Sequence, residues 1–179
     1  MAPGTRRYDP ERRQRIVDAA IRVVGAKGIA GLSHRSVAAE ADVPLGSTTY
    51  HFATLDDLLV AALRQADEAF ARAFVLPEGV DLADALAKLL GEFLGADRGR
   101  AELEYELYLA ALRRPALRPV AAQWCETVSR ALAGYTDPQT ARALVAVMDG
   151  ISLQVLLTDT PYEEAYAREV LSRVLGPAR

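Results

Sequence analysis

The sequence has few of the residues on which most metal and redox chemistry depends. Of its 179 residues one is cysteine, Cys125, and two are histidine, His34 and His51. A single cysteine excludes an internal disulfide and favours a reducing compartment; we interpret it as a small, partly buried apolar side chain. No metal-spaced Cys/His set, phosphate-binding loop or nucleophile-elbow pattern occurs. We therefore predict no enzyme and no cofactor, although catalysis by carboxylates alone stays open.

Long apolar runs are also lacking. No run approaches the roughly 18 residues needed to span a membrane. The opening stretch MAPGTRRYDPERRQR has no apolar region of the kind that a secretory signal needs. We therefore predict a cytoplasmic protein with no membrane contact. Apolar residues still make up 51% of the chain and charged residues 25%, a composition typical of a globular protein.

Net charge is small but unevenly distributed. The total of −3 argues against generic nucleic-acid binding. Residues 1–54 nevertheless carry eight basic and five acidic side chains, whereas the other 125 residues carry 13 basic and 19 acidic ones. A basic head on an acidic body indicates a head that meets an anion, although so small a bias is also common by chance.

Helical periodicity extends through almost the whole chain, and no segment has a convincing strand pattern. The spacing predicts helices from about residue 11 to 25, 33 to 41, 45 to 52, 54 to 76, 82 to 94 and 100 to 112, and further ones starting at 115, 137 and 160. Ser33 is an expected N-cap, and Thr54 with Asp57 an expected capping box. Asp137-Pro138 and Thr160-Pro161 each pair an N-cap residue with proline at the first helical position.

The predicted helix at 137–157 is apolar nearly all round, so it is expected to be buried on most sides. The last helix plus a second subunit would cover it; the central helix of a monomer is the alternative. Asp149 within it needs a partner, either a cationic ligand or a group across a dimer. The alternating Glu102, Glu104 and Glu106 are interpreted as solvated surface.

The stretch VPLGSTTYHFATLDDLL, residues 43–59, follows one short predicted helix and contains a second. Two short helices joined by a tight turn with an apolar residue, Val43, form a helix-turn-helix pattern. In that motif the N-terminal residues of the second helix face base edges, where short polar side chains allow close approach. Phe52 would point inward as an anchor. A polar capping turn before a long helix is the bland alternative.

These residues resemble the N-terminal domain of the TetR family of bacterial transcriptional regulators, over residues 11–63. The positions that carry the resemblance are Ala38, Ala41, Val43, Gly46, Tyr50, Phe52 and Leu58. The resemblance implies an all-α fold with a three-helix DNA-binding head at 1–54, joined by a long helix to a helical ligand-binding and dimerisation domain at 55–179. The DNA-binding residues it implies are Arg35, Leu45, Gly46, Ser47, Thr48, Thr49, Tyr50 and His51. Arg6, Arg7 and Arg12 are expected to form a flexible arm along the DNA backbone or in the minor groove, with solvated surface charge as the alternative.

Three positions depart from the family pattern. Leu55 stands where a lysine usually contacts phosphate; we expect the start of the fourth helix to offer backbone N–H groups instead. Asp42 replaces a turn glycine, a mild change because Asp tolerates left-handed backbone better than most residues. Thr49 replaces a common aromatic residue, which predicts a subfamily-specific base preference.

The resemblance further implies a homodimer through the last two helices that binds a palindromic operator on double-stranded DNA. A small-molecule effector in the C-terminal pocket would release it by shifting the fourth helix. The candidate ligand-binding residues are Phe70, Phe93, Tyr105, Tyr108, Trp124, Met148 and Gln154, each of which ordinary core packing would also explain. A ligand-binding or adaptor dimer whose head no longer reads DNA is the alternative function.

Overall fold

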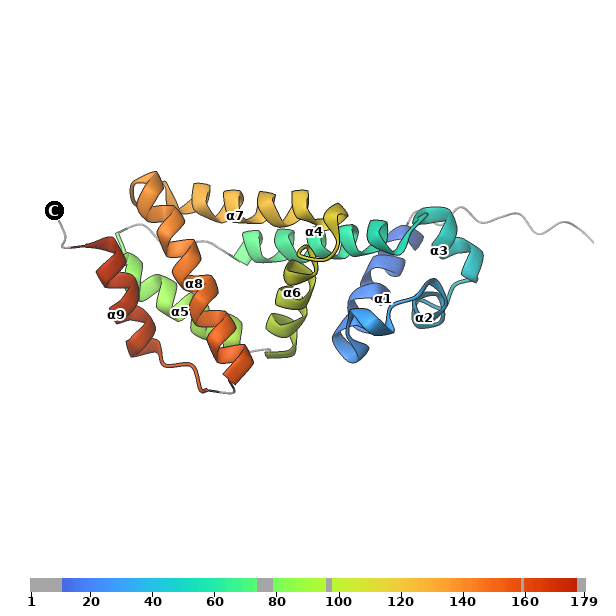
Figure 1. Cartoon of the computed structure of the whole chain (residues 1–179), viewed down its shortest axis with the longest axis horizontal. Helices are drawn as coiled ribbons and strands as arrows, with labels where there is room; N and C mark the ends of the chain where they lie inside the picture. Colours follow the sequence, from blue (N-terminus) through green and yellow to red (C-terminus); the bar gives the residue numbers. More distant parts are fainter. Residues whose placement is uncertain (1–10, 74–78, 96–97, 159, 177–179) are drawn as a thin grey trace, which may run out of the picture. The chain divides into compact units, whose positions relative to one another are not determined.

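The structure is a computed structural model that describes residues 11–73, 79–95, 98–158 and 160–176, with the side chains of 69–73 left out. Within these ranges every regular element is a helix, which confirms the all-α prediction (Figure 1). The chain's contacts divide it into two compact units, Met1–Ala62 and Leu63–Arg179. The division falls inside helix α4 (Leu55–Ala73), eight residues after the boundary predicted at 54.

The first unit is built on α1 (Arg12–Lys27), the short 3-10 turn η1 (Ile29–Gly31), α2 (His34–Glu40), α3 (Leu45–His51) and the start of α4. Helix α2 packs on both α1 and α3. The core side chains are apolar and almost fully buried: Ile16, Val17, Val24, Val37, Phe52, Leu58 and Leu59. Phe52 is 2% exposed, as predicted, and the Arg13 guanidinium lies 4.9 Å from its ring centre.

Local hydrogen bonds define the helix starts of this unit. The Ser33 hydroxyl accepts from the Ser36 N–H at 3.0 Å, which confirms the predicted N-cap of α2. Thr54 Oγ1 accepts from the Asp57 N–H at 3.0 Å, and Asp57 Oδ2 accepts from the Thr54 N–H at 2.9 Å. This reciprocal pair is the predicted capping box of α4. The turn between α2 and α3 bends through Asp42, whose φ of 51° lies in the left-handed region.

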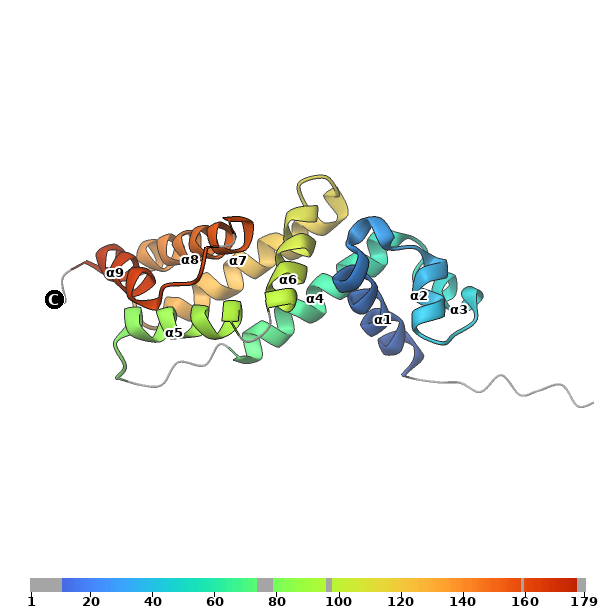
Figure 2. The ribbon, with the colours of Figure 1, turned by 90° about the horizontal axis from the view of Figure 1, so that it is seen from below.

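The second unit contains the rest of α4 and five further helices: α5 (Leu82–Gly95), α6 (Arg98–Ala110), α7 (Arg118–Leu132), α8 (Pro138–Thr158) and α9 (Glu164–Leu175). Helices α5, α8 and α9 pack against one another, and α7 packs on α8 (Figure 2). Leu86, Leu132, Leu144 and Leu171, all 0% exposed, come from four different helices and form the centre of this core.

Two predicted helix starts differ from the structure. Pro115 opens a single 3-10 turn, η2 (Pro115–Leu117), and the α-helix follows at Arg118. Helix α9 begins at Glu164 and not at Thr160-Pro161. The Tyr162 hydroxyl donates to the Ala87 carbonyl of α5 at 2.5 Å, so this segment is held to α5 before the helix begins.

Helix α8 also qualifies the prediction about apolar runs. It is long and apolar enough, by length and composition alone, to cross a membrane, because Arg142 and Asp149 are its only charged residues. Its buried residues pack against α5, α7 and α9, as expected of the core helix of a helical domain.

Candidate functional site

The exposed face of α3 is the first candidate site. Leu45 is 47% exposed and Tyr50 84%, an unusual exposure for two large apolar side chains in a seven-residue helix. Gly46 and Thr49 are exposed between them, while Ser47 and His51 are half-buried. On α2, Arg35 is also exposed. Seven of the eight predicted DNA-binding residues are therefore exposed or partly exposed. Six of them lie on α3, and the seventh, Arg35, lies on the preceding helix.

Thr48 is the exception and corrects the sequence prediction. It is 0% exposed, and its hydroxyl donates to the Leu45 carbonyl at 2.8 Å. The His34 carbonyl of α2 lies 3.5 Å from the same hydroxyl. Helical spacing places position 48 on the side of α3 that faces α2, so this threonine joins the two helices and has no surface with which to read a base.

Gly46 is not required by the packing of the chain itself. A Cβ built at this position would meet no other atom within 4 Å. An alanine costs less than glycine within a helix, by about 0.5–1 kcal/mol, so a glycine here sacrifices some helix stability. The missing side chain leaves the backbone of α3 open to close approach from outside.

Other features of the head differ from the predictions. Arg12 is the first residue of α1 and half-buried, so it is not part of a flexible arm; Arg6 and Arg7 lie outside the described residues. The capping box occupies the N–H groups of Thr54 and Asp57, and the first turn of α4 carries Asp56 and Asp57. Their negative charges disfavour a phosphate at this helix start, contrary to the expectation that it compensates for Leu55.

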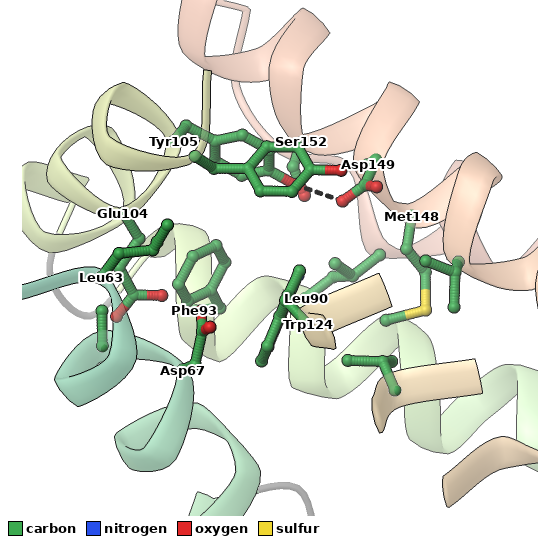
Figure 3. A pocket seen from close by; sticks show the side chains of 14 residues that line it. Leu63, Asp67, Leu90, Phe93, Glu104, Tyr105, Trp124, Met148, Asp149 and Ser152 are labelled. Carbon is green, nitrogen blue, oxygen red and sulfur yellow. Dashed lines mark hydrogen bonds between the residues drawn. The ribbon is translucent and has the colours of Figure 1, made fainter. Parts of the chain in front are cut away.

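The second candidate site is a cavity of about 60 Å³ inside the second unit (Figure 3). Helices α4, α5, α6, α7 and α8 all contribute to its wall. Five of the seven predicted ligand residues line it: Phe93, Tyr105, Tyr108, Trp124 and Met148. Gln154 is exposed on α8 and does not line it, which corrects that prediction, and the side chain of Phe70 lies outside the described residues.

Aromatic rings form much of the cavity wall. The ring centres of Phe93 and Tyr105 are 6.4 Å apart, and those of Tyr105 and Tyr108 are also 6.4 Å apart, in an edge-to-face arrangement. The Tyr108 hydroxyl lies 3.0 Å from Cys125 Sγ on α7. Burial and the contact with this thiol raise the pKa of Tyr108, so its hydroxyl stays protonated. The wall offers flat apolar surfaces with few polar atoms, as in small-molecule sites.

Three carboxyl groups, of Asp67, Glu104 and Asp149, also line the cavity. Figure 3 shows Asp67 and Glu104 at one side and Asp149, beside Ser152, at the other. The Tyr105 hydroxyl donates to Asp149 Oδ1 at 3.0 Å. Tyr105 is thus the partner that Asp149 was expected to need, and it belongs to the same chain. Ser152 Oγ is buried and makes no hydrogen bond of standard geometry in the described part of the chain, although its interaction with the Tyr105 hydroxyl opposes the rise of the Tyr105 pKa.

Sequence reasoning missed Asp67 and misplaced Glu104. Glu104 was interpreted as solvated, yet its side chain is only 14% exposed and accepts from Arg100 Nε at 2.8 Å. A signal for Asp67 exists in the sequence, because it lies four residues after Leu63 and beside Ala66, on the apolar stripe of α4. Burial, and then the charges of Glu104 and Glu68, raise the pKa of Asp67 to about 7.

Family models match both units of the chain. Residues 16–62 match a family model described as bacterial regulatory proteins, tetR family, and residues 77–177 match the tetracyclin repressor-like C-terminal domain. The nicotine-responsive transcriptional repressor HdnoR of Paenarthrobacter nicotinovorans is 30% identical over 80% of this chain and 83% of its own.

Two solved structures are more similar in sequence to this chain than HdnoR is. The multidrug binding protein EbrR, crystallised with ethidium, is 73% identical, with a TM-score of 0.88 over 93% of this chain and 100% of its own. Other crystal structures of EbrR contain proflavin and malachite green. A TetR-family member from Streptomyces coelicolor A3 is also 73% identical, with a TM-score of 0.85 over 94% of this chain and 100% of its own.

Proposed function

The chain belongs to the TetR family of ligand-responsive, DNA-binding transcriptional regulators, and from this premise we propose that aromatic cations are its effectors. The observation that carries the proposal is the cavity of the second unit, in which aromatic walls surround three carboxyl groups. Ethidium, proflavin and malachite green, the ligands of the similar EbrR structures, are all aromatic cations. Aromatic faces and carboxylates both attract such ions.

Effector binding requires the cavity to widen. Its volume of about 60 Å³ is far below the roughly 300–1,000 Å³ of typical ligand sites. A three-ring cation must therefore displace side chains on the surrounding helices. Among these, α4 begins in the first unit and lines the cavity through Leu63, Ala66 and Asp67. A shift of α4 in response to the effector is our proposed route to operator release.

We assign operator recognition to the exposed face of α3, with Thr48 omitted. The residues proposed to contact DNA are Arg35, Leu45, Gly46, Ser47, Thr49, Tyr50 and His51. The free space around Gly46 supports close approach of the α3 backbone to the groove. Gly46→Ala should keep or slightly increase the stability of the head and weaken operator binding. A variant with both properties unchanged would contradict this assignment.

The regulator is proposed to act in the cytoplasm as a homodimer through α8 and α9, with no enzymatic activity. Residues 143, 146, 150, 153 and 157 of α8 are spaced by three and four and form a stripe of small and apolar side chains that is exposed or partly exposed. Leu157 is 77% exposed there, and Tyr166 of α9 is 52% exposed. Ala146→Arg should yield monomers in sedimentation experiments, whereas Arg142→Ala should leave the dimer intact.

Selection of bound duplexes from a random DNA library, at two salt concentrations, tests the DNA-binding half of the proposal. A palindromic consensus with half-sites about one helical turn apart is the expected result. Absence of enrichment at either salt would favour the alternative of an adaptor that no longer reads DNA.

Cation-dependent release is tested with the selected duplex and malachite green. Because aromatic cations also bind DNA, Trp124→Ala serves as the control: it should bind the operator normally and need more malachite green for release. Equal sensitivity of the two proteins would show that the dye acts on the DNA and not through the cavity.

A further inference from the structure

The three carboxyl groups of the cavity differ in what they are paired with. Asp149 accepts from the Tyr105 hydroxyl at 3.0 Å, and Glu104 accepts from Arg100 Nε at 2.8 Å. In the described part of the chain Asp67 has neither a hydrogen bond nor an ion pair, although it is half-buried. A half-buried carboxylate without a partner is unfavourable. Asp67 is therefore the group whose charge an incoming ligand would best compensate.

The surroundings of Asp67 add negative charge. The titratable or charged groups facing it are Glu104 and Tyr108 from α6, Asp149 from α8, and Glu68 and Arg64 from its own helix. Helices α5 and α7 contribute uncharged side chains: Leu90, Phe93, Gln123, Trp124 and Thr127. Burial and the nearby carboxylates act in the same direction, and both favour a protonated Asp67 in the empty cavity.

A second buried polar group supports a ligand site at this place. Ser152, in the wall of the same cavity, is 1% exposed, and its hydroxyl makes no hydrogen bond of standard geometry in the part of the chain that is described, although it lies close enough to the Tyr105 hydroxyl to oppose the rise of the Tyr105 pKa. Buried hydroxyls are normally hydrogen-bonded, because an unsatisfied one loses its bonds to water without replacement. The cavity thus holds Asp67, which has no partner in the described part of the chain, and a buried hydroxyl, that of Ser152, whose contact with Tyr105 falls short of standard hydrogen-bond geometry.

We propose that Asp67 recognises the positive charge of the effector, and that the cation takes the place of a proton on this carboxyl group. The inference rests on the proposed function, since it names the residue that selects cations among aromatic ligands. When the effector enters, the O–H bond of Asp67 breaks and the proton leaves to solvent. One positive charge replaces another, so the net charge of the cavity does not change. That exchange avoids leaving an uncompensated charge in a half-buried site.

The exchange makes effector binding depend on pH. Below pH 7 Asp67 is mainly protonated, so a permanently charged cation must release that proton before it can pair with the carboxylate. Affinity should therefore rise with pH, by up to about tenfold per pH unit in the acidic range. Above pH 7 the carboxylate is already free of its proton, and the affinity should level off. Effectors would act more strongly on the protein at alkaline than at acidic pH.

Calorimetric titration of the full chain with ethidium, in the absence of DNA, tests the proposal. Measurements between about pH 5.5 and 8.5, in two buffers of different ionisation enthalpy, count the protons released. We expect about one proton per bound ethidium at the acidic end and almost none at the alkaline end. Asp67→Asn should release none, and should weaken binding about tenfold or more at alkaline pH.

Matched variants separate charge recognition from structural damage. Glu68→Gln removes an exposed carboxyl one position along the same helix; because the Glu68 charge is the smallest of the three causes that raise the pKa of Asp67, this variant should keep most of the affinity and of the proton release. Asp67→Glu keeps a carboxyl group, so it should retain part of the affinity and part of the proton release that Asp67→Asn loses. Phenanthridine, the uncharged ring system of ethidium, should bind Asp67→Asn as well as it binds the original protein at neutral pH. Circular dichroism melts of each variant establish that it is folded.

Two results would overturn the inference and leave the proposed function standing. One is tight ethidium binding with no proton release at any pH. The other is loss of proton release in Asp149→Asn and its retention in Asp67→Asn, which would move the charge-recognising role to Asp149. Failure of the protein to bind ethidium, proflavin or malachite green at any pH would instead overturn the proposed function itself.

Discussion

The two units of this protein use their polar residues in opposite ways. In the first unit the candidate DNA-binding side chains lie outside, on a small helix whose inner face is held by an apolar core, and Tyr50 is 84% exposed. In the second unit the candidate ligand-binding groups lie inside, where Asp67, Glu104 and Asp149 line a cavity between helices. An operator is too large to be enclosed, whereas the proposed small cation can be enclosed where carboxylates and aromatic rings offset the loss of its hydration. The location of each candidate site fits the size of the partner proposed for it.

The largest expected change in stability comes from the first unit, where buried Phe52 can be compared with exposed Tyr50. Phe52→Ala removes a ring that is 2% exposed and should lower the free energy of unfolding of the head by about 3–5 kcal/mol. Tyr50→Ala, two residues earlier, should change it by no more than about 0.5 kcal/mol, yet weaken operator binding. Urea unfolding and operator titration of both variants give the comparison. Similar stability losses in both would show that Tyr50 is also a packing residue.

The turn between α2 and α3 should give the next largest effect. Asp42 has a φ of 51°, a conformation that a β-branched side chain adopts only with strain. Asp42→Val should cost about 1–3 kcal/mol of stability, whereas Asp42→Gly should be tolerated. Thermal melts of the two variants test this prediction. A well-tolerated valine would mean that the turn can change its backbone path without loss.

A smaller effect with a distinctive pH dependence is expected in the second unit. The pKa of Asp67 is raised from 3.8 to about 7 in the folded protein, so between these values the folded state holds more protons than the unfolded state. The contribution of Asp67 to the free energy of unfolding therefore falls as pH rises through this window, and stays constant above it. Asp67→Asn should lack this decline.

The asparagine variant should also be more stable than the original protein near pH 8. Because Asp67 is only half-buried and solvent screens its charge, we expect a gain of about 1–2 kcal/mol there, well below what the full pKa shift would imply. Urea unfolding at several pH values, compared with Glu68→Gln, checks the prediction. A parallel pH dependence in both variants would show that Asp67 is not the titrating group.

The smallest effect concerns the two neighbouring threonines of α3. Thr48→Val removes a buried hydroxyl that donates to the Leu45 carbonyl, and should cost about 1 kcal/mol while leaving the selected operator sequence unchanged. Thr49→Val should leave stability almost unchanged and alter the base preference. A changed operator consensus for Thr48→Val would reinstate it as a DNA-reading residue.

The sequence was sufficient for several features that depend on near neighbours along the chain, although not for the helix start at Pro115, where a 3-10 turn precedes α7. The caps at Ser33 and Thr54, the tolerance of Asp42 for a left-handed backbone and the burial of Phe52 follow from local chemistry and helical spacing. The start of α9 was misplaced by four residues, because Tyr162 bonds to the carbonyl of Ala87, which lies 75 residues away. No local pattern contains that contact.

In the candidate sites, too, some features follow from the local sequence and others depend on contacts between distant segments. The helix spacing and the family resemblance were enough to name α3 as the candidate DNA-binding helix, and five aromatic or apolar residues of the cavity were named from sequence. Whether a residue of α3 faces α2 or solvent depended on how the two helices pack, and that packing excluded Thr48. Likewise, Asp67 and Glu104 are 37 positions apart, and their mutual effect on charge exists only because α4 and α6 meet around one cavity. Propensity and periodicity act over a few residues, whereas burial and electrostatic coupling arise only when distant segments come together.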